Sequence, residues 1–202
     1  MGRGTSHPPQ FFAFALEFAV AAANWLRYFY LAYASRPKSE RTLYRLVKRH
    51  RAVRIVEVGV SDIGRTASLI QVAQRFAVSE KVSHTGLDWF DARSKPLAEL
   101  PLKEAHRILR ATGANVRLVP GDPAVSLPTV ANAHQNTDFI LISHAVADDD
   151  LKSAWFYVPR MLHQKSVVLR EKRTNSGEPA FEWLSLAQIA EWAGRNGRRR
   201  AA

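Results

Sequence analysis

The sequence contains no cysteine, and this absence removes several kinds of chemistry at once. It excludes disulfides, thiolate metal sites and a cysteine nucleophile. A chain without disulfides fits a reducing compartment, so we expect a cytoplasmic protein. Acidic residues are also scarce, with 18 Asp and Glu against 29 Lys and Arg and a formal net charge of +11. This balance predicts attraction to a polyanion such as nucleic acid or an anionic membrane face.

The remaining composition is that of an ordinary globular protein. A chain of 202 residues has room for one domain with a full core. Hydrophobic residues make up 47% of it and charged residues 23%, as is usual for soluble domains. We divide the chain into a leader with an apolar helix, residues 1–34, and an α/β domain, residues 35–202. The basic end of that domain, residues 195–202, is predicted to be disordered.

The N-terminal segment from residue 11 to residue 34 is strongly apolar and free of Gly and Pro, which predicts a helix. Glu17, Asn24 and Arg27 interrupt it, which argues against a membrane-spanning helix. No basic segment and small-residue cleavage site frame it, which argues against a signal peptide. Two alternatives stay open. The helix packs on the domain or on a partner, or it lies in a membrane interface, where aromatic side chains are favoured.

A strongly basic segment follows. Between Arg36 and Arg54 the chain carries eight Lys and Arg residues against one acid, Glu40. Within it, residues 39–51 are predicted to form a helix with an apolar face and a basic stripe. Three interpretations of the basic stripe stay open. It is a solvated helix face, a surface that contacts an anionic membrane, or a surface that contacts nucleic-acid phosphates. No nucleic-acid motif of known spacing is present. We therefore predict a protein that is cytoplasmic or peripheral to a membrane. Whether the chain forms a homo-oligomer is a separate question that the sequence leaves open.

From residue 53 onward, short apolar runs alternate with helical patterns. Strands are expected at 53–58, 82–87, 116–119, 138–142 and 166–169, and helices at 65–76, 100–111, 151–162 and 186–193. This alternation predicts a doubly wound, Rossmann-like parallel sheet with right-handed crossovers and the strand order 3-2-1-4-5. Ligands of such sheets bind beyond the carboxyl ends of the strands, where the strand order reverses.

The turns after the first two strands carry the most informative residues. The first apolar run ends in Glu57 and enters a turn that contains Gly59, which lets the backbone bend sharply beside a ligand. The second run ends in Gly86-Leu87-Asp88. The carboxylates of Glu57 and Asp88 are placed to accept hydrogen bonds from an amine or from ribose hydroxyls. The pattern predicts a pocket for a cofactor that contains a nucleoside.

With these motifs, residues 42–171 resemble the class I S-adenosylmethionine-dependent methyltransferases, in particular the branch whose first motif begins E-x-G. The resemblance implies that S-adenosylmethionine is the cofactor, that Glu57 orients its amino-acid end and that the Gly59 backbone approaches it. It implies that Asp88 binds the ribose hydroxyls, that Trp89 packs on the adenine and that Asp122 contacts the adenine amine. The remaining positions of the predicted cofactor site are Ser61, Gly64 and Ser143.

The chain also departs from that family. Ser61 replaces the second glycine of the first motif, and Gly64 lies one residue beyond the usual third. After the fourth strand, Ser143 and His144 stand where many members place an acid, and we predict no metal site. His144 is the candidate general base, with a structural role as the alternative. The usual C-terminal hairpin is predicted to be reduced or missing, since only residues 179–184 read as a short strand.

These patterns favour a methyltransferase-like protein that transfers a methyl group to an unknown acceptor, a reaction that needs chiefly proximity and alignment. The alternative is a non-catalytic binding or scaffold protein of the same fold, held to a membrane surface or a protein partner through residues 11–54. A nucleotide or dinucleotide binder is disfavoured, because no G-x-G-x-x-G motif is present. The first interpretation requires Glu57 and Asp88 to converge on one open crevice.

Overall fold

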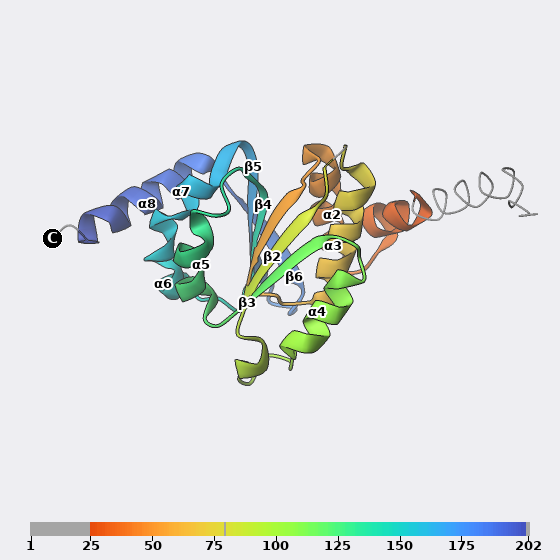
Figure 1. Cartoon of the computed structure of the whole chain (residues 1–202), viewed down its shortest axis with the longest axis horizontal. Coiled ribbons are helices and arrows are strands. Elements are labelled where there is room, and N and C mark those ends of the chain that lie inside the picture. Colours follow the sequence, from red (N-terminus) through yellow and green to blue (C-terminus); the bar gives the residue numbers. More distant parts are fainter. Residues whose placement is uncertain (1–24, 79, 201–202) are drawn as a thin grey trace, which may run out of the picture.

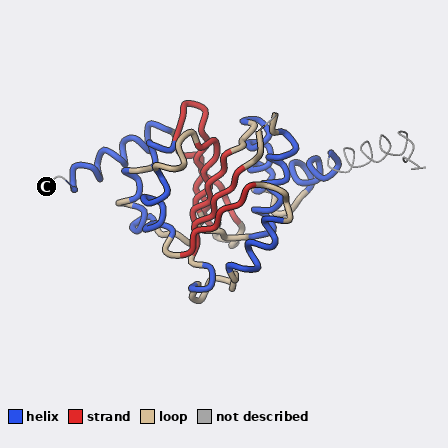
Figure 2. The backbone as a smooth tube through the Cα atoms, viewed as in Figure 1, coloured by secondary structure: helices blue, strands red, loops and turns tan. Residues whose placement is uncertain are grey.

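The computed structural model describes residues 25–78 and 80–200, and the fold is built on one sheet. The sheet has six strands in the order β3-β2-β1-β4-β5-β6 (Figure 2). Its parallel strands are β1 (Arg54–Val58), β2 (Ser83–Asp88), β3 (Asn115–Pro120), β4 (Thr137–Ile142) and β5 (Leu162–Arg173). The last strand, β6 (Pro179–Leu184), runs antiparallel to β5. The doubly wound prediction is confirmed, and the reduced C-terminal hairpin takes the form of this single antiparallel strand.

Helices cover both faces of the sheet and bury its apolar side chains (Figure 1). One layer holds α2 (Glu40–His50), α3 (Ile63–Phe76) and α4 (Leu102–Arg110). The other holds α5 (Pro123–Ala131), α6 (Asp148–Leu151), α7 (Val158–Met161) and α8 (Leu186–Arg200). Successive side chains of a strand point to opposite faces of the sheet and so contribute to two hydrophobic cores, one under each helix layer. In β1, Ile55 faces the first layer, while Val56 and Val58 face the second.

The strand order places the switch point at β1. This strand pairs with β2 on one side and with β4 on the other, so the chain turns in opposite directions from it. Glu57 lies opposite Gly86 of β2 in the register. Because side chains two residues apart share a face, Glu57 and Asp88 lie on the same face, at the carboxyl edge of the sheet. This edge is where a doubly wound sheet binds its ligand.

Several predicted boundaries need correction. The helix expected at 151–162 is three short pieces: α6, the turn η3 (Ala154–Phe156) and α7. Pro159, which has no N–H to continue a helix, stands in the first turn of α7. The fifth strand is longer than the apolar run at 166–169, because its polar end pairs with β6 as far as Arg173. The basic tail expected to be disordered from residue 195 is helical as far as Arg200.

The N-terminal segment is described from residue 25. Residues 25–29 are helical and lead into the π-helical turn η1 (Tyr30–Ala34), in agreement with the helix expected there. The predicted leader and the first part of the apolar helix, residues 1–24, lie outside the described residues. Among the residues that are described, no helix combines the length and the apolar character needed to cross a membrane.

Candidate functional site

The turn after β1 is shaped by the packing of the chain against itself. Gly59 has φ +80, a backbone conformation that side chains disfavour. A Cβ atom at this position would lie 2.7 Å from Ser143 Cβ and 2.9 Å from Val146 Cγ2. The Gly59 N–H donates to the Leu87 carbonyl at 2.7 Å. Gly59 therefore holds the ends of β1, β2 and β4 together, whatever ligand lies at this edge.

Glu57 is buried on the face of the sheet that α3 covers. Its side chain is 1% exposed. Its Oε2 accepts a hydrogen bond from Thr66 Oγ1 at 2.8 Å and lies 3.2 Å from His84 Nε2. Its other oxygen, Oε1, is buried without a hydrogen-bond partner among the described residues. Buried carboxylate oxygens are normally hydrogen-bonded, so Oε1 retains an acceptor that a ligand amine would satisfy.

Asp88 is also buried, but its acceptors are fully used. Its Oδ2 accepts from the Val60 N–H at 2.7 Å, and its Oδ1 accepts from the Phe90 N–H at 2.8 Å. Arg93 donates to both oxygens, with Nε 2.7 Å from Oδ1 and Nη2 2.8 Å from Oδ2. An ionised carboxylate offers about four lone pairs, and these contacts take all of them. The acid predicted to bind ribose is therefore occupied by the chain itself.

Arg93 presents to Asp88 the pattern that a ribose would present. The guanidinium offers two parallel N–H groups, one to each carboxylate oxygen. The neighbouring hydroxyls of a ribose would offer two O–H donors to the same pair of oxygens. Two further Arg93 N–H groups donate to the carbonyls of Ala98, at 2.9 Å, and Val60. Arg93 thus occupies the carboxylate acceptors at the position where the ribose was expected.

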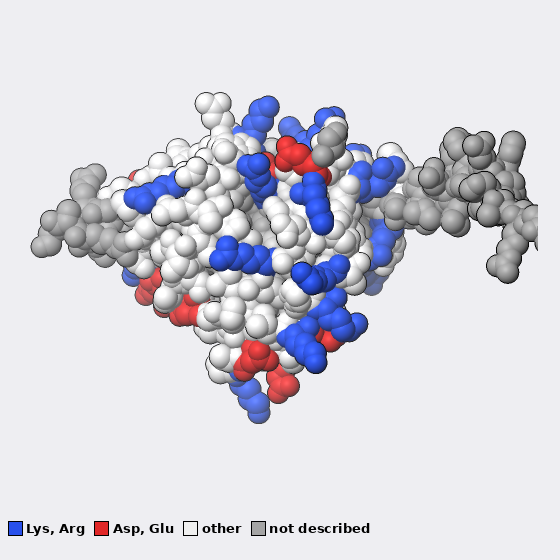
Figure 3. Space-filling view, in the orientation of Figure 1, with Lys and Arg blue, Asp and Glu red and all other residues white. Residues whose placement is uncertain are grey.

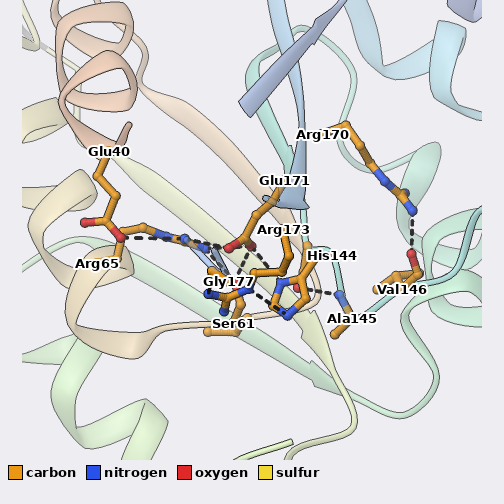
Figure 4. A network of polar contacts seen from close by, with 12 residues as sticks. Glu40, Ser61, Arg65, His144, Ala145, Val146, Arg170, Glu171, Arg173 and Gly177 are labelled. Carbon is orange, nitrogen blue, oxygen red and sulfur yellow. Dashed lines mark hydrogen bonds and ion pairs between the residues drawn. The ribbon is translucent and has the colours of Figure 1, made fainter. Parts of the chain in front are cut away.

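A second buried ion pair lies between α3 and the end of β5 (Figure 4). The Arg65 guanidinium makes two hydrogen bonds of 3.1 Å to the Glu171 carboxylate, one to each oxygen. Ser61 donates to Glu171 Oε2 and accepts from Arg65. Glu40, at the start of α2, lies 3.8 Å from Arg65 Nη1. The next residue back along β5, Arg170, points to the other face and donates to the Val146 carbonyl at 2.6 Å.

This pairing fixes the charges of both groups. Burial alone would raise the pKa of the Glu171 carboxyl, but the hydrogen bonds and charge of Arg65, with Ser61 and His144, outweigh it and lower the pKa to about 2. Burial alone would lower the pKa of Arg65, but Glu171, Glu57 and Glu40 outweigh it and raise that pKa. Burial raises the pKa of Glu40, although the charge of Arg65 acts against it.

The lowered pKa of Glu171 predicts a loss of stability in acid. Because its pKa falls from 4.5 to about 2 on folding, its contribution is complete above about pH 4.5 and is lost as the pH falls towards 2. The difference corresponds to about 3 kcal/mol. Glu40, whose pKa is raised, acts in the opposite direction, since it stabilises below its unfolded pKa. Urea unfolding between about pH 6 and pH 2 should show this decline, and Glu171→Gln should remove most of it. An equal slope in both proteins would contradict the assignment.

His144 belongs to the same network rather than to an open catalytic position. Its Nε2 accepts a hydrogen bond from Arg173 Nε at 3.3 Å, and its Nδ1 lies 3.4 Å from Glu171 Oε2 (Figure 4). The ring nitrogen that would take a proton from a substrate, Nε2, already accepts the hydrogen bond from Arg173. The contacts favour the structural alternative for this histidine.

The other predicted site residues have the following places. Ser61 is engaged by Arg65 and Glu171. Gly64 is exposed in the first turn of α3, and Asp122 caps α5 by accepting from the Ala124 N–H at 2.8 Å. Trp89 is half-buried and packs on the second core, beside Asp88. Ser143 is buried and its Oγ accepts from the Ala145 N–H at 3.1 Å.

Sequence reasoning missed three residues that dominate this edge: Arg65, Arg93 and Glu171. The available signal for Glu171 was a single acid just beyond the apolar run of β5, between the basic residues Arg170 and Lys172. Arg93 lies in an irregular segment near the turn η2 (Phe90–Ala92), where no periodicity exists to place it. Over residues 25–78 and 80–200, no three His, Asp or Glu side chains come together as a group that could hold a metal ion.

No protein-family model and no curated protein sequence matches the chain. Solved structures do match. Cofactor-bound Rv0187 from MTB is 20% identical with a TM-score of 0.50, over 96% of this chain and 85% of the other. An O-methyltransferase from Bacillus cereus in complex with SAH is 20% identical with a TM-score of 0.50, over 91% and 76%. The O-methyltransferase TomG from Streptomyces achromogenes, in complex with SAM, is 17% identical with a TM-score of 0.51, over 83% and 69%. The chain has the Rossmann-like fold of the class I S-adenosylmethionine-dependent methyltransferases.

Proposed function

We propose that the chain binds S-adenosylmethionine, or the demethylated S-adenosylhomocysteine, at the carboxyl edge of β1, and that Arg93 leaves Asp88 when the ribose binds. The observation that carries the proposal is the placement of Glu57 and Asp88 on one face at the switch point of the sheet. The fold supports it, since solved structures of this fold are described in complex with SAM or SAH.

The two carboxylates fit the cofactor to different degrees. Glu57 Oε1 is a buried acceptor without a partner among the described residues, and it suits the ammonium group of the methionine end. Asp88 suits the ribose only after Arg93 has moved, because its lone pairs are otherwise taken. When bound, the cofactor would supply an electrophilic methyl group. The chain would hold and orient it, since alignment is the main requirement of methyl transfer. These contacts do not identify the chemical class of the methyl acceptor.

The proposal predicts that weakening the Arg93 interaction strengthens cofactor binding. In the native protein the ligand must break a buried, bidentate ion pair before its hydroxyls reach Asp88. Arg93→Gln keeps one donor for Asp88 and removes the competing charge. We expect it to bind S-adenosylhomocysteine at least about tenfold more tightly than the native protein, which corresponds to about 1.4 kcal/mol. Isothermal titration calorimetry of both proteins measures the difference.

Arg107→Gln is the matched control, because Arg107 pairs with Glu104 on the exposed face of α4, outside the site. Its affinity should equal that of the native protein. Failure of the folded native protein and of Arg93→Gln to bind in the millimolar range would overturn the proposal. Asp88→Ala is a poor test, since it also removes the acceptor of the Val60 and Phe90 N–H groups.

A second candidate function is a non-catalytic binding or scaffold protein in which Arg93 replaces the cofactor permanently. The full occupation of Asp88 by Val60, Phe90 and Arg93 favours it. Ser143 also stands where many proteins of this family place an acid. The same titration separates the two candidates, because a permanent substitute predicts no saturable heat with S-adenosylmethionine in the native protein.

A further inference from the structure

A basic groove lies at the end of α3 opposite to the cofactor edge. It has a volume of about 630 Å³. We define the basic groove by its five cations, Arg45, Lys48, Arg49, Arg51 and Arg75. The helix α3 begins at the carboxyl edge with Arg65 near its start and ends at the groove with Phe76. Its 14 residues span about 20 Å, so the groove is separate from the site proposed for the cofactor.

The cations of the basic groove are not neutralised by the chain. In the part of the chain that the structure describes, none of the five forms an ion pair with a carboxylate. Arg45 and Arg49 stand four residues apart on α2, an arrangement of like charges that destabilises a helix. Lys and Arg side chains gather over the half of the molecule that holds α2 to α4 (Figure 3). This concentration of positive charge attracts anions and favours an anionic partner.

Aromatic rings position the charges. Lys48 Nζ lies 4.7 Å from the ring centroid of Tyr28 and 5.1 Å from that of Phe76. The Arg75 guanidinium lies 5.9 Å from the centroids of Trp25 and Phe76. Cation–π contacts of this kind hold the side chains without cancelling their charge. The groove is therefore organised before any partner arrives.

An exposed aromatic rim continues from the groove. We define the aromatic rim as Trp25, Phe29 and Tyr33, which are 38%, 47% and 55% exposed. The rings of Phe29 and Tyr33 are stacked with centroids 5.9 Å apart, and Tyr33 also lines the groove. Leu26, on the same helical segment, is 72% exposed. In the sequence, residues 11–24 before the rim are apolar apart from Glu17 and Asn24.

We propose that the basic groove and the aromatic rim form a docking surface for an anionic lipid bilayer. The cations meet the lipid phosphates, and the rim lies at the headgroup boundary, where aromatic side chains are favoured. The exposed leucine favours a bilayer over nucleic acid, because an aliphatic side chain neither stacks on bases nor contacts phosphate. The proposal does not depend on cofactor binding, since no residue is shared between the two sites.

Co-sedimentation of the full chain with lipid vesicles tests the proposal. We expect binding to phosphatidylcholine vesicles that contain phosphatidylglycerol, little binding to pure phosphatidylcholine, and weaker binding as salt is added. The double variant Arg45→Glu/Arg49→Glu should lose at least about tenfold in affinity, since each basic residue near an anionic membrane surface contributes to the attraction. Phe29→Ser should also weaken binding, and the loss should persist at high salt.

Lys103→Glu/Arg117→Glu is the charge-matched control. Both residues are exposed, on α4 and β3, and lie outside the groove. This variant has the same net charge as the groove variant and should bind nearly as well as the native protein. An equal loss in both double variants, or equal binding to neutral and anionic vesicles, would overturn the proposal. Tighter binding of a short RNA than of vesicles, or a dimer that Arg45→Glu/Arg49→Glu dissociates, would replace the bilayer with that partner.

Discussion

Replacing Glu171 with Gln is expected to lower the free energy of unfolding by about 3 to 5 kcal/mol. The carboxylate is buried and satisfies two Arg65 donors and Ser61 Oγ. Glutamine has nearly the same shape but no charge, so the variant leaves the buried Arg65 guanidinium with only the more distant carboxylate of Glu40, 3.8 Å away. A buried charge that loses its partner costs far more than an exposed one. Urea unfolding at neutral pH measures the loss.

Glu182→Gln supplies the comparison for Glu171→Gln. Glu182 forms an ion pair with Lys172 at 2.7 Å, but both side chains are exposed. Its replacement should cost less than about 1 kcal/mol. The double variant Arg65→Met/Glu171→Leu should recover most of the lost stability, because a buried pair can be exchanged for apolar side chains at little cost. Similar losses for Glu171→Gln and Glu182→Gln would show that the Arg65–Glu171 pair is open to water.

The strand order and the position of the site could be predicted because they depend on local patterns. Apolar runs that end in Gly and Asp mark buried parallel strands, and right-handed crossovers leave few ways to arrange them. Glu57 is the last residue but one of β1 and Asp88 is the last of β2, so their convergence at one edge follows from the topology. The same argument placed Gly59 at the turn after β1, where its φ is +80.

The contents of the site could not be predicted, because they depend on contacts that no local pattern contains. Arg65 and Glu171 are 106 residues apart in the chain, and only the packing of α3 against the end of β5 joins them. Arg93 reaches Asp88 across a tight turn in which Phe90 has a φ of 48, a value that a bulky residue rarely takes. The sequence therefore identified the acid at the ribose position but not the guanidinium that occupies it.

Gly59→Ala is expected to lower the free energy of unfolding by about 2 to 5 kcal/mol without any ligand. A side chain at φ +80 costs about 1 to 2 kcal/mol. The new Cβ would also lie 2.7 Å from Ser143 Cβ and 2.9 Å from Val146 Cγ2, and overpacking of this kind costs about 1 to 3 kcal/mol more. Both neighbours are buried, so neither can move away freely.

Gly177→Ala separates the two contributions to the Gly59→Ala effect. Gly177 has φ +78, but among the described residues, its two chain neighbours apart, no atom lies within 4 Å of the position of its Cβ. Its replacement should show the backbone cost alone, about 1 to 2 kcal/mol. Ser143→Gly should restore part of the stability of Gly59→Ala, since it removes the nearest atom. Equal losses of stability in Gly59→Ala and Gly177→Ala would mean that Ser143 and Val146 move enough to accommodate the new Cβ, so that overpacking adds no cost. A larger loss for Gly59→Ala would mean that this glycine is needed by the fold itself, before any cofactor approaches it.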